Sequence, residues 1–383
     1  MKRFRHERSR KDEGRTAGPG RGGAGRGTPH DAGGKGAGRS KRHPGSAASK
    51  AQDTARYVVT GGAGFVGSNL VAALAKLDPT GEIIVIDDFR TGSTANIVEA
   101  FDREGLEPFS GVVLPVSIED LDFEPLLESM DVRAFFHLAA ITDTTVTDES
   151  VMLAVNATPM MSIMQACVGA GVPLVYASSA ATYGTPPQTA ARQAFPLSAA
   201  GRPSNVYGFS KWLMECEHRR LSEALSSPPQ IVGLRYFNVF GPGESRKGKM
   251  ASMAYQLAQQ MLAGKPPRLF ADGSQSRDQV HVADVVACTL AAAGLGARPD
   301  PAPGIYNLGS GVATSFATVA DAVRRGLGLR DLPTDYFEMP ASIRAFYQDF
   351  TQADMGETIK GLGWTPMHEP IAALETYGRF LAR

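Results

Sequence analysis

The segment VVTGGAGFVGSNL, residues 58–70, decides the fold of this 383-residue chain. A short apolar strand runs into a glycine turn in which a helix begins, and Gly61, Gly64 and Gly67 are spaced three residues apart. Glycines allow the tight turn and let backbone N–H groups approach a pyrophosphate at the positive end of the helix. We therefore expect a dinucleotide-binding unit here; an ordinary strand-to-helix turn is the alternative.

Beyond this segment, short apolar runs alternate with longer amphipathic stretches. Strands are expected at 57–60, 82–87, 111–117, 134–139, 173–178 and 230–239, and helices at 65–77, 151–170, 206–225 and 250–263. Alternation of this kind, with strands that are apolar throughout, predicts a parallel sheet covered by helices on both faces. The expected fold class is α/β: a Rossmann-type doubly wound parallel sheet at 56–240, with a smaller substrate domain at 241–383 that is interleaved with it.

The first 55 residues form a basic, Gly- and Arg-rich tail. Residues 1–50 hold 14 Lys and Arg against four Asp and Glu, whereas the remainder carries 25 against 35. With almost no large apolar side chain after Phe4, the tail cannot offset the entropy of ordering itself, so we expect disorder. Its charge could attach it to a polyanion such as a nucleic acid. An inert extension, or an upstream start that is not used, is the alternative we favour.

The cysteines and the hydropathy pattern limit the compartment. Cys167, Cys216 and Cys288 stand far apart, and no Cys or His cluster has metal-ligand spacing, so a reduced cytoplasm fits best and no metal is expected. The tail lacks the apolar core of a secretory signal, and no apolar run approaches the roughly 18 residues of a membrane span. We expect a soluble, cytoplasmic protein with no membrane partner.

The next strand ends in two carboxylates, Asp87 and Asp88, about 20 residues after the last glycine of the turn. A carboxylate at this point accepts hydrogen bonds from the adenosine ribose hydroxyls and repels a 2′-phosphate. The pattern therefore favours NAD over NADP. Arg90, two residues further on, could still pair with a 2′-phosphate.

A candidate catalytic group follows the fifth strand. Ser178 and Ser179, in YASSAATYG (176–184), reach the carboxyl edge of the sheet, where open α/β folds hold ligands. Tyr207 and Lys211, in NVYGFSK (205–211), are one turn apart on a predicted helix. Side chains at i and i+4 meet on any helix, and a tyrosine packed in the core is the alternative. A nearby ammonium nevertheless favours phenolate, so we expect Lys211 to lower the pKa of Tyr207 and make it a base.

A glycine loop, a strand-end serine and Tyr-x-x-x-Lys, in this order, resemble the extended short-chain dehydrogenase/reductase superfamily over 57–383. YASSAATYG, NVYGFSK, LRYFNVFGPGESRKGKMAS (234–252) and FYQDFTQAD (346–354) look most like the ADP-L-glycero-D-manno-heptose 6-epimerases. The resemblance implies that Ser179 holds the reacting hydroxyl or ketone and that Lys211 binds the nicotinamide ribose. It assigns Lys247 as a second acid or base, because one base cannot easily serve both orientations of the substrate. A solvated loop charge or a phosphate contact is the alternative for Lys247.

Further site residues follow from the same resemblance. The expected substrate contacts are Ser179, Asn238, Lys249, Gln256, Arg277 and Tyr347. The expected cofactor contacts are Gly61, Gly64, Phe65, Val66, Gly67, Asp87, Asp88, Leu138, Ala139, Ala140, Asn156, Tyr207 and Lys211. The planar fork of Arg277 suits a diphosphate, with a surface ion pair as the alternative, and we expect structural roles for His137 and His281. Lys249, Gln256 and Thr94 stand where the family has a serine, a histidine and an NADP-binding lysine, and the last change again favours NAD.

These observations lead to an expected function. We expect a nucleotide-sugar epimerase that works by transient oxidation, with one NAD or NADP tightly bound per subunit and NAD favoured. The first expected substrate is ADP-D-glycero-D-manno-heptose, epimerised at C6; a UDP-hexose 4-epimerase or a related epimerase/dehydratase is the alternative, and a non-catalytic nucleotide-binding scaffold is a third. A 4,6-dehydratase resembles this scaffold but carries Asp-Glu where this chain has Ala180 and Ala181. We expect a homo-oligomer that binds a nucleotide sugar and no nucleic acid.

Overall fold

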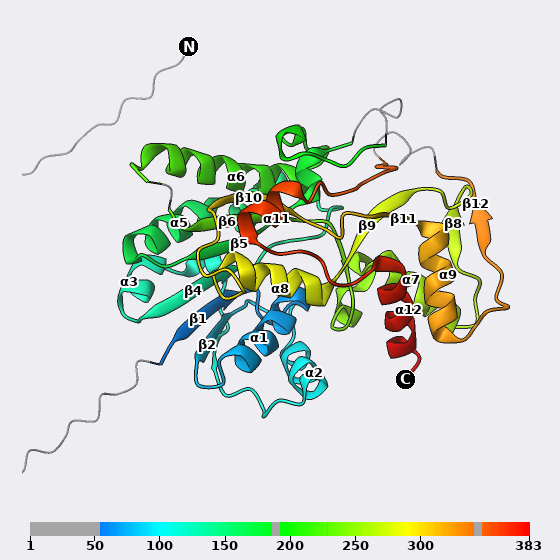
Figure 1. Cartoon of the computed structure of the whole chain (residues 1–383), viewed down its shortest axis with the longest axis horizontal. Helices are drawn as coiled ribbons and strands as arrows, with labels where there is room; N and C mark the ends of the chain where they lie inside the picture. The colour runs from blue at the N-terminus through cyan, green and yellow to red at the C-terminus, as the bar shows by residue number, and fades with distance from the viewer. Residues whose placement is uncertain (1–53, 186–191, 228, 341–346) are drawn as a thin grey trace, which may run out of the picture. The chain divides into compact units, whose positions relative to one another are not determined.

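A seven-stranded, fully parallel sheet forms the centre of the computed structural model, which describes residues 54–185, 192–227, 229–340 and 347–383 (Figure 1). The strand order is β10-β6-β5-β4-β1-β2-β3. The strands are β1 (Arg56–Thr60), β2 (Glu82–Ile86), β3 (Val112–Leu114), β4 (Val132–His137), β5 (Leu174–Ser179), β6 (Ile231–Tyr236) and β10 (Gly304–Leu308). The predicted doubly wound α/β fold is therefore confirmed. The predicted tail at 1–55 lies outside the described residues, except for Thr54 and Ala55.

Helices cover both faces of this sheet (Figure 1). One face holds α1 (Phe65–Leu77), α2 (Thr94–Glu104) and α8 (Val282–Ala292); the other holds α3 (Phe123–Glu128), α4 (Glu149–Asn156), α5 (Thr158–Ala170) and α6 (Val206–Ala224). Successive strand residues point to opposite faces, so Val59 packs in the cluster that contains α1, whereas Val58 packs in the cluster that contains α5. Strands buried on both faces need the continuous apolar runs that the sequence has.

The C-terminal part of the chain contributes both to this sheet and to a smaller group of elements. After Gly241, β10 joins the large sheet and α8 packs on one of its faces, beside α1. Near β10 lies α11 (Gly356–Leu362). The smaller group contains β7 (Asn238–Phe240), β9 (Ser276–His281) and β11 (Ala313–Ser315) in one sheet and β8 (Arg268–Phe270) and β12 (Asp335–Phe337) in another. Its helices are α7 (Met253–Leu262), α9 (Phe316–Leu327) and α12 (Pro370–Leu381).

Two predicted elements are each divided in the structure. The helix expected at 151–170 is α4 followed by α5, with a break at Ala157, because Pro159 at the start of α5 has no N–H to continue the helical ladder. The strand expected at 230–239 becomes β6 and β7, which pair in different sheets on either side of Phe237. This second break turns the chain from the large sheet toward the small one.

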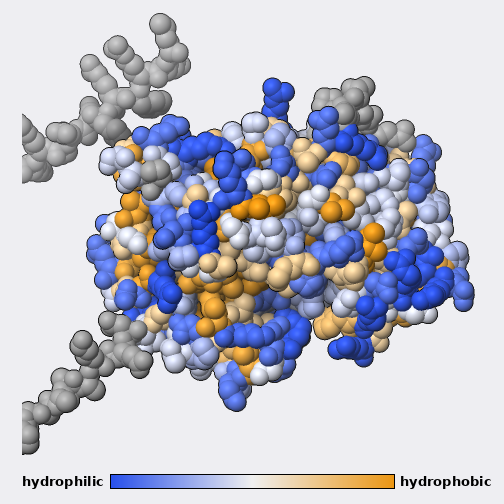
Figure 2. All heavy atoms as spheres, viewed as in Figure 1, coloured by the Kyte–Doolittle hydropathy of each residue, from blue (hydrophilic) through white to orange (hydrophobic). Residues whose placement is uncertain are grey.

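The stretch 149–170 has the length and apolar composition that would suffice to cross a membrane, contrary to the expectation that no apolar run approaches that length. Half of it is buried, because α4 and α5 pack against α3 and α6 as a core layer. The face of the molecule in Figure 2 is covered mainly by hydrophilic residues, with apolar residues in smaller areas between them. The apolar character of 149–170 is thus explained by packing on the sheet.

Four 3₁₀ segments complete the described elements: η1 (Ile118–Asp120), η2 (Ala180–Tyr183), η3 (Leu197–Ala199) and η4 (Ser245–Met250). Two of them matter for the site. The η2 segment follows Ser179 directly, and η4 carries Lys247.

Candidate active site

A cavity of about 790 Å3 opens where the carboxyl ends of the parallel strands meet. Its walls come from the glycine loop, the ends of β2, β4 and β5, the first turns of α6 and the loop at 241–252. Ligands of open α/β sheets bind at this edge. The cavity therefore brings together most of the predicted cofactor residues and the four predicted catalytic residues, Ser179, Tyr207, Lys211 and Lys247.

Close backbone packing in the glycine loop requires its glycines. Gly61 has a φ of 69°, and a Cβ there would lie 2.7 Å from the backbone nitrogen of Ala139. A Cβ on Gly67 would lie 2.0 Å from the carbonyl oxygen of Gly61. Gly64 is the N-cap of α1 and has no side chain to cap the first turn, whose residues line the cavity. The close packing and the uncapped helix end fit a dinucleotide pyrophosphate.

The two carboxylates after β2 differ in their surroundings. Asp87 is buried, and its oxygens accept N–H bonds from Ala63 and Phe89, both at 2.9 Å. Burial raises the pKa of Asp87, although these hydrogen bonds lower it in part. Each carboxylate oxygen has a further acceptor site, so Asp87 can still hold a ribose hydroxyl. Asp88 pairs with Arg90 at 3.1 Å, so this arginine is already engaged by a carboxylate.

The predicted catalytic pair lies at the start of α6. Asn205 caps this helix by accepting the N–H of Gly208 at 2.8 Å. Tyr207 follows in the first turn, and its hydroxyl lies near the side chain of Ser179. Lys211, one turn later, is only 3% exposed and donates from Nζ to the carbonyl oxygen of Ala177 at 2.9 Å. The end of β5 and the start of α6 thus face each other across the cavity wall.

The expected effect of Lys211 on Tyr207 is not found. Burial raises the pKa of Tyr207, and the nearby side chain of Ser179 lowers it only in part. Burial also lowers the pKa of Lys211 to about 7. Because the ammonium is directed to the carbonyl oxygen of Ala177 and is itself desolvated, it does not stabilise phenolate. The structure therefore presents Tyr207 as a neutral phenol.

Lys247 reaches the same cavity from η4. The loop that carries it is anchored by Glu244, a fully buried carboxylate that accepts the N–H of Gly241 at 3.1 Å and the hydroxyl of Ser252 at 2.8 Å. The Nζ of Lys247 lies 5.3 Å from the ring centroid of Phe65, in the first turn of α1. Burial lowers the pKa of Lys247, with an opposing effect from the charge of Glu244. A lowered pKa favours the neutral amine, which is the form that can accept a proton.

The two unusual residues of this loop have different positions. Lys249 lines the cavity, is exposed, and pairs with Asp143 at 3.0 Å and with the hydroxyl of Thr145 at 2.9 Å. Gln256 does not line the cavity among the residues that the structure describes; it donates to the carbonyl oxygen of Ala251 at 2.7 Å. The expected substrate contact of Gln256 is thus replaced by a bond that holds its own loop.

The remaining predicted substrate residues lie in and behind one wall. Asn238 lines the cavity, and its Nδ2 donates to the carbonyl oxygen of Asp278 at 3.3 Å. Arg277 is 8% exposed, with its guanidinium carbon 5.6 Å from the ring centroid of Phe316 and 5.3 Å from that of Tyr347. Phe316 lines the cavity, whereas Arg277 and Tyr347 do not among the described residues. Burial lowers the pKa of Arg277. Its guanidinium therefore lies next to the wall rather than in it.

Asn156, expected at the cofactor, does not line the cavity within the described part of the chain. It is 1% exposed, accepts the N–H of Ile141 at 2.8 Å and donates to the hydroxyl of Ser210 at 3.1 Å. These bonds fix the loop after β4 to α6. Asn156 therefore supports the cofactor wall from behind.

His137 pairs through Nδ1 with the hydroxyl of Thr60 at 2.8 Å, and burial lowers its pKa to about 3. His281 caps α8 by accepting the N–H of Ala283, and burial lowers its pKa to about 4. In the described residues, no group of three or more His, Cys, Asp or Glu side chains could hold a metal ion.

Sequence reasoning missed several residues of the cavity. Arg246 lines it and pairs with Glu99 on α2, 147 positions away, while its Nη1 also donates to Asn96 at 3.0 Å. Asp143 closes another side through its pair with Lys249. Contacts between such distant positions leave no local pattern in the sequence.

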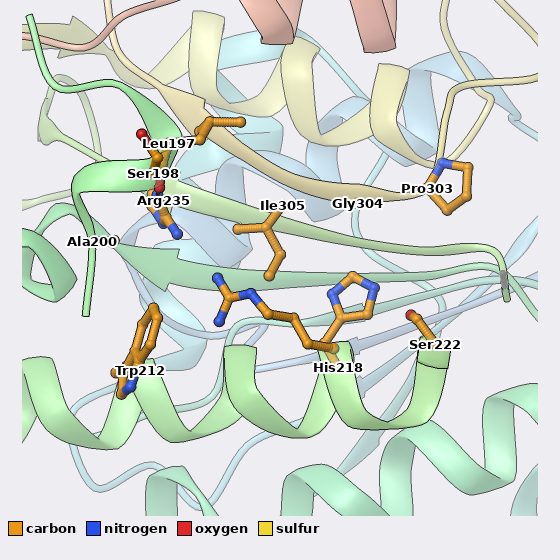
Figure 3. Close-up of a pocket in the computed structure, with 11 residues that line it drawn as sticks. Leu197, Ser198, Ala200, Trp212, His218, Ser222, Arg235, Pro303, Gly304 and Ile305 are labelled. Atoms are coloured by element: carbon orange, nitrogen blue, oxygen red, sulfur yellow. Dashed lines mark hydrogen bonds between the residues drawn. The ribbon is translucent and has the colours of Figure 1, made fainter. Parts of the chain in front are cut away.

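A second cavity, of about 590 Å3, lies between α6, η3, β6 and β10 and shares no lining residue with the first among the described residues (Figure 3). Trp212, His218 and Ser222 on α6 face it, opposite Ile305 on β10. It contains none of the predicted site residues. The candidate active site is therefore the cavity at the carboxyl edge of the sheet.

Comparisons with known proteins show which family and which solved structures the chain is similar to. The model of the NAD dependent epimerase/dehydratase family matches residues 57–309. The solved structure of an ADP-L-glycero-D-manno-heptose-6-epimerase from Helicobacter pylori has 30% sequence identity and a TM-score of 0.73, over 86% of this chain and 96% of that one.

Two more distant structures share the fold. A UDP-N-acetylglucosamine 4-epimerase from Methanobrevibacter ruminantium has 23% identity and a TM-score of 0.72, over 86% of this chain and 98% of that one. A UDP-glucuronic acid 4-epimerase from Bacillus cereus, solved with UDP-glucuronic acid and NAD, has 23% identity and a TM-score of 0.69, over 85% and 98%.

Proposed function

The chain belongs to the NAD dependent epimerase/dehydratase family, and from this premise we propose that it inverts C6 of ADP-D-glycero-D-manno-heptose through a transient 6-keto intermediate. The observation that carries the proposal is the presence of Lys247 and Tyr207, from different elements, in one cavity. Inversion requires a proton to leave the sugar oxygen in one orientation of the substrate and to return in another. Two acid/base groups can serve these two orientations.

The shifts of the two pKa values indicate which group would act as the base and which as the acid. Burial lowers the pKa of Lys247, so its amine is a suitable base for the C6 hydroxyl. Burial raises the pKa of Tyr207, so its neutral phenol is a suitable acid for the oxygen of the ketone in the other orientation. The roles exchange in the reverse reaction. Ser179, whose side chain lies near Tyr207, would hold that oxygen.

NAD fits the remaining part of the cavity. The loop from Gly61 to Gly67 and the uncapped start of α1 would hold its pyrophosphate, and Asp87 would accept from its adenosine ribose. Lys211 would donate to the nicotinamide ribose. The bound cofactor would supply reversible acceptance of the C6 hydride.

The choice of sugar is supported by the 30% identity to the Helicobacter pylori heptose epimerase and by the loop KGKMAS at 247–252. Asn238 and Lys249, which line the cavity outside the glycine loop, would contact the sugar and its phosphates. Arg277 and Tyr347 would reach the diphosphate if the side chain of Phe316 moves aside.

The test is direct conversion of defined substrates. The purified protein is incubated with ADP-D-glycero-D-manno-heptose and with a panel of UDP-, GDP- and dTDP-hexoses, and the products are identified by NMR. Formation of the L-glycero epimer would support the proposal. Inversion of a UDP-hexose at C4, with no reaction of the heptose, would replace it with the alternative 4-epimerase. No reaction of any sugar, although NAD binds, would favour a non-catalytic role.

A further inference from the structure

Three consecutive residues at the end of β5, 177–179, each lie beside a different turn of α6, and two of them are hydrogen-bonded to it. The hydroxyl of Tyr207 lies near the side chain of the last of the three, and Lys211 donates to the carbonyl oxygen of the first at 2.9 Å. The hydroxyl of Ser178, between them, donates to Glu215 at 2.7 Å. Tyr207, Lys211 and Glu215 are spaced four residues apart and therefore share one face of the helix. Glu215 is the one member of this row to which the proposed chemistry gives no role.

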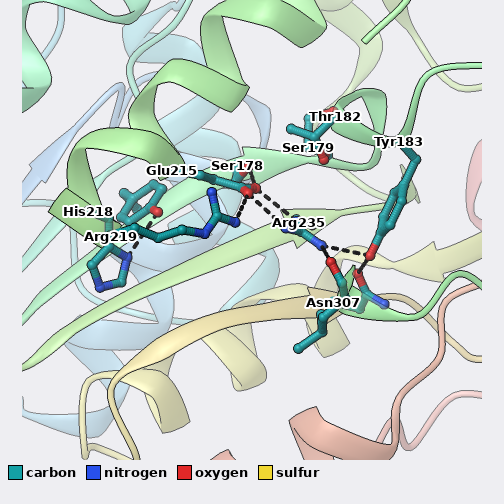
Figure 4. A network of polar contacts seen from close by, with 11 residues as sticks. Ser178, Ser179, Thr182, Tyr183, Glu215, His218, Arg219, Arg235 and Asn307 are labelled. Atoms are coloured by element: carbon teal, nitrogen blue, oxygen red, sulfur yellow. Dashed lines mark hydrogen bonds and ion pairs between the residues drawn. The ribbon is translucent and has the colours of Figure 1, made fainter. Parts of the chain in front are cut away.

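Glu215 also forms the centre of a buried ionic network (Figure 4). It is 0% exposed and Arg235 on β6 is 1% exposed. Oε1 of Glu215 accepts from Nε of Arg235 at 2.8 Å and Oε2 from Nη2 at 2.7 Å, which is a two-point contact. Arg219 donates to Oε2 at 2.9 Å. With Ser178 included, four donors surround one carboxylate, which matches its number of acceptor sites.

Arg235 extends the network to the segment after the serine strand. Its Nη1 donates to the hydroxyl of Tyr183 in η2 at 2.8 Å and to the carbonyl oxygen of Leu197 at 2.9 Å. Tyr183 in turn donates to Asn307 on β10 at 2.7 Å. Burial alone would lower the pKa of Arg235, but the hydrogen bonds and charge of Glu215 raise it above its usual value. The network therefore connects α6 to both sides of Ser179.

We propose that Glu215, paired with Arg235, is a positioning residue that sets the separation between Tyr207 and Lys211 on α6 and Ser179 on β5. The inference rests on the proposed function of these three residues. Buried ion pairs are costly to desolvate, and well-packed apolar pairs are often at least as stable, so stability alone is a weak reason for this one. What an apolar pair could not supply is a directed bond to Ser178, which fixes one helix face against one strand end. Misplacement of about 1 Å can reduce turnover by about 100-fold.

Two matched variants separate positioning from simple stability. Ser178→Ala and Arg219→Gln each remove one hydrogen bond to the same carboxylate and leave the pair of Glu215 with Arg235 intact, so both should fold. Only Ser178 connects that carboxylate to the strand of Ser179. We expect kcat to fall by about 10- to 100-fold in Ser178→Ala with little change in KM, and to stay within about twofold in Arg219→Gln. Equal losses in the two variants would overturn the proposal.

Ser178 also lines the active-site cavity, so a direct contact with substrate must be distinguished from an effect through Glu215. Glu215→Met, which removes both carboxylate oxygens, and the double variant with Ser178→Ala complete a double-mutant cycle. If Ser178 acts through Glu215, the double variant loses no more activity than Glu215→Met alone. If instead the activity loss of the double variant equals the product of the two single losses, the residues act independently. That result would contradict the proposal.

A measurement without substrate keeps the inference separate from the proposed function. The pKa of the Lys211 amine, about 7 in the structure because of burial, can be followed by NMR of isotope-labelled lysine. We expect a shift of its titration in Ser178→Ala and none in Arg219→Gln, because only the first variant removes a bond between α6 and the strand end that Lys211 contacts. Identical titrations in both variants would refute a positioning role even if no sugar is converted. Conversely, suppose that the wild-type protein converts no sugar while the Lys211 titration still shifts in Ser178→Ala. That result would refute only the proposed function.

Discussion

Replacement of Lys247 by methionine removes the amine and keeps most of the side-chain length. Lys247 lies over Phe65 in the cavity, with a pKa that burial lowers. If it is one of two acid/base groups, its loss should reduce epimerisation by about 10²- to 10⁴-fold, the usual contribution of such groups. That range corresponds to about 2.7 to 5.5 kcal/mol in the activation free energy.

Lys249, two residues later in the same loop, provides the matched control. It carries the same charge, but it is exposed, and its contacts are the pair with Asp143 and the bond to Thr145. An exposed ion pair contributes about 0.2–1 kcal/mol, which is at most about a fivefold effect. We therefore expect Lys249→Met to raise KM with little change in kcat, and Lys247→Met to lower kcat while NAD affinity changes little.

The assay uses both the full epimerisation and a half-reaction. Full epimerisation is followed by NMR of the heptose. A substrate analogue with an aldehyde at C6 allows one molecule to be oxidised and another reduced without inversion, so each base can be examined alone. We expect Lys247→Met to abolish inversion and to retain part of this dismutation. Normal epimerisation in Lys247→Met would show that the lysine is only a phosphate or surface contact, and it would remove the main reason to prefer a 6-epimerase.

Three further predictions concern the cofactor and pH. NAD should bind more tightly than NADP, because Asp88 holds Arg90 at 3.1 Å and a 2′-phosphate would meet carboxylates; a lower dissociation constant for NADP would contradict this. Gly67→Ala should weaken NAD binding and cost about 1–3 kcal/mol of stability, since its Cβ would lie 2.0 Å from a carbonyl oxygen, whereas Gly169→Ala on α5 meets nothing within 4 Å and should not destabilise. Thermal unfolding should become easier as pH falls from about 6.5 to 4, by up to about 1.4 kcal/mol per pH unit for each buried neutral histidine, because the unfolded chain binds protons that the folded one does not. A melting temperature that stays constant over this window would contradict that reading. The buried histidines are His137 and His218, whose pKa values burial lowers to about 3 and 4; the half-buried His281, with a pKa lowered to about 4, should contribute less.

Sequence patterns predict those parts of the fold that depend only on residues close together in the sequence. The helix expected at 65–77 is α1 with the same bounds, because the glycine turn starts it and its apolar face continues without interruption. The helix at 151–170 has equally continuous apolar periodicity, but Pro159 divides it. The strand at 230–239 is divided without a local signal. Phe237 separates two strands because their partners belong to different sheets, and that depends on the whole chain.

The candidate site shows the same limit. Tyr207, Lys211 and the glycines could be assigned because their spacing is itself the motif. The environment of Tyr207 could not, because the pKa of its hydroxyl depends on burial among residues distant in sequence. Glu215 went unnoticed for a similar reason. Its partner Arg235 is 20 positions away on another element, and an isolated glutamate on a helix is usually a solvated one.

The loop at 241–252 has a buried anchor and exposed ion pairs. This difference determines which of its residues can be substituted to change substrate choice. Glu244 is buried and fixes both ends of the loop, so its loss should damage the fold. Arg246 and Lys249 instead make exposed ion pairs, with Glu99 and Asp143, that contribute little to stability. Substitution of those two residues can therefore alter what the cavity accepts without moving Lys247. If this view is correct, Arg246→Gln should change the relative KM values of the sugar panel and leave the melting temperature within a few degrees of wild type. A large loss of stability in Arg246→Gln would mean instead that its contact with α2 is needed to hold the loop in place.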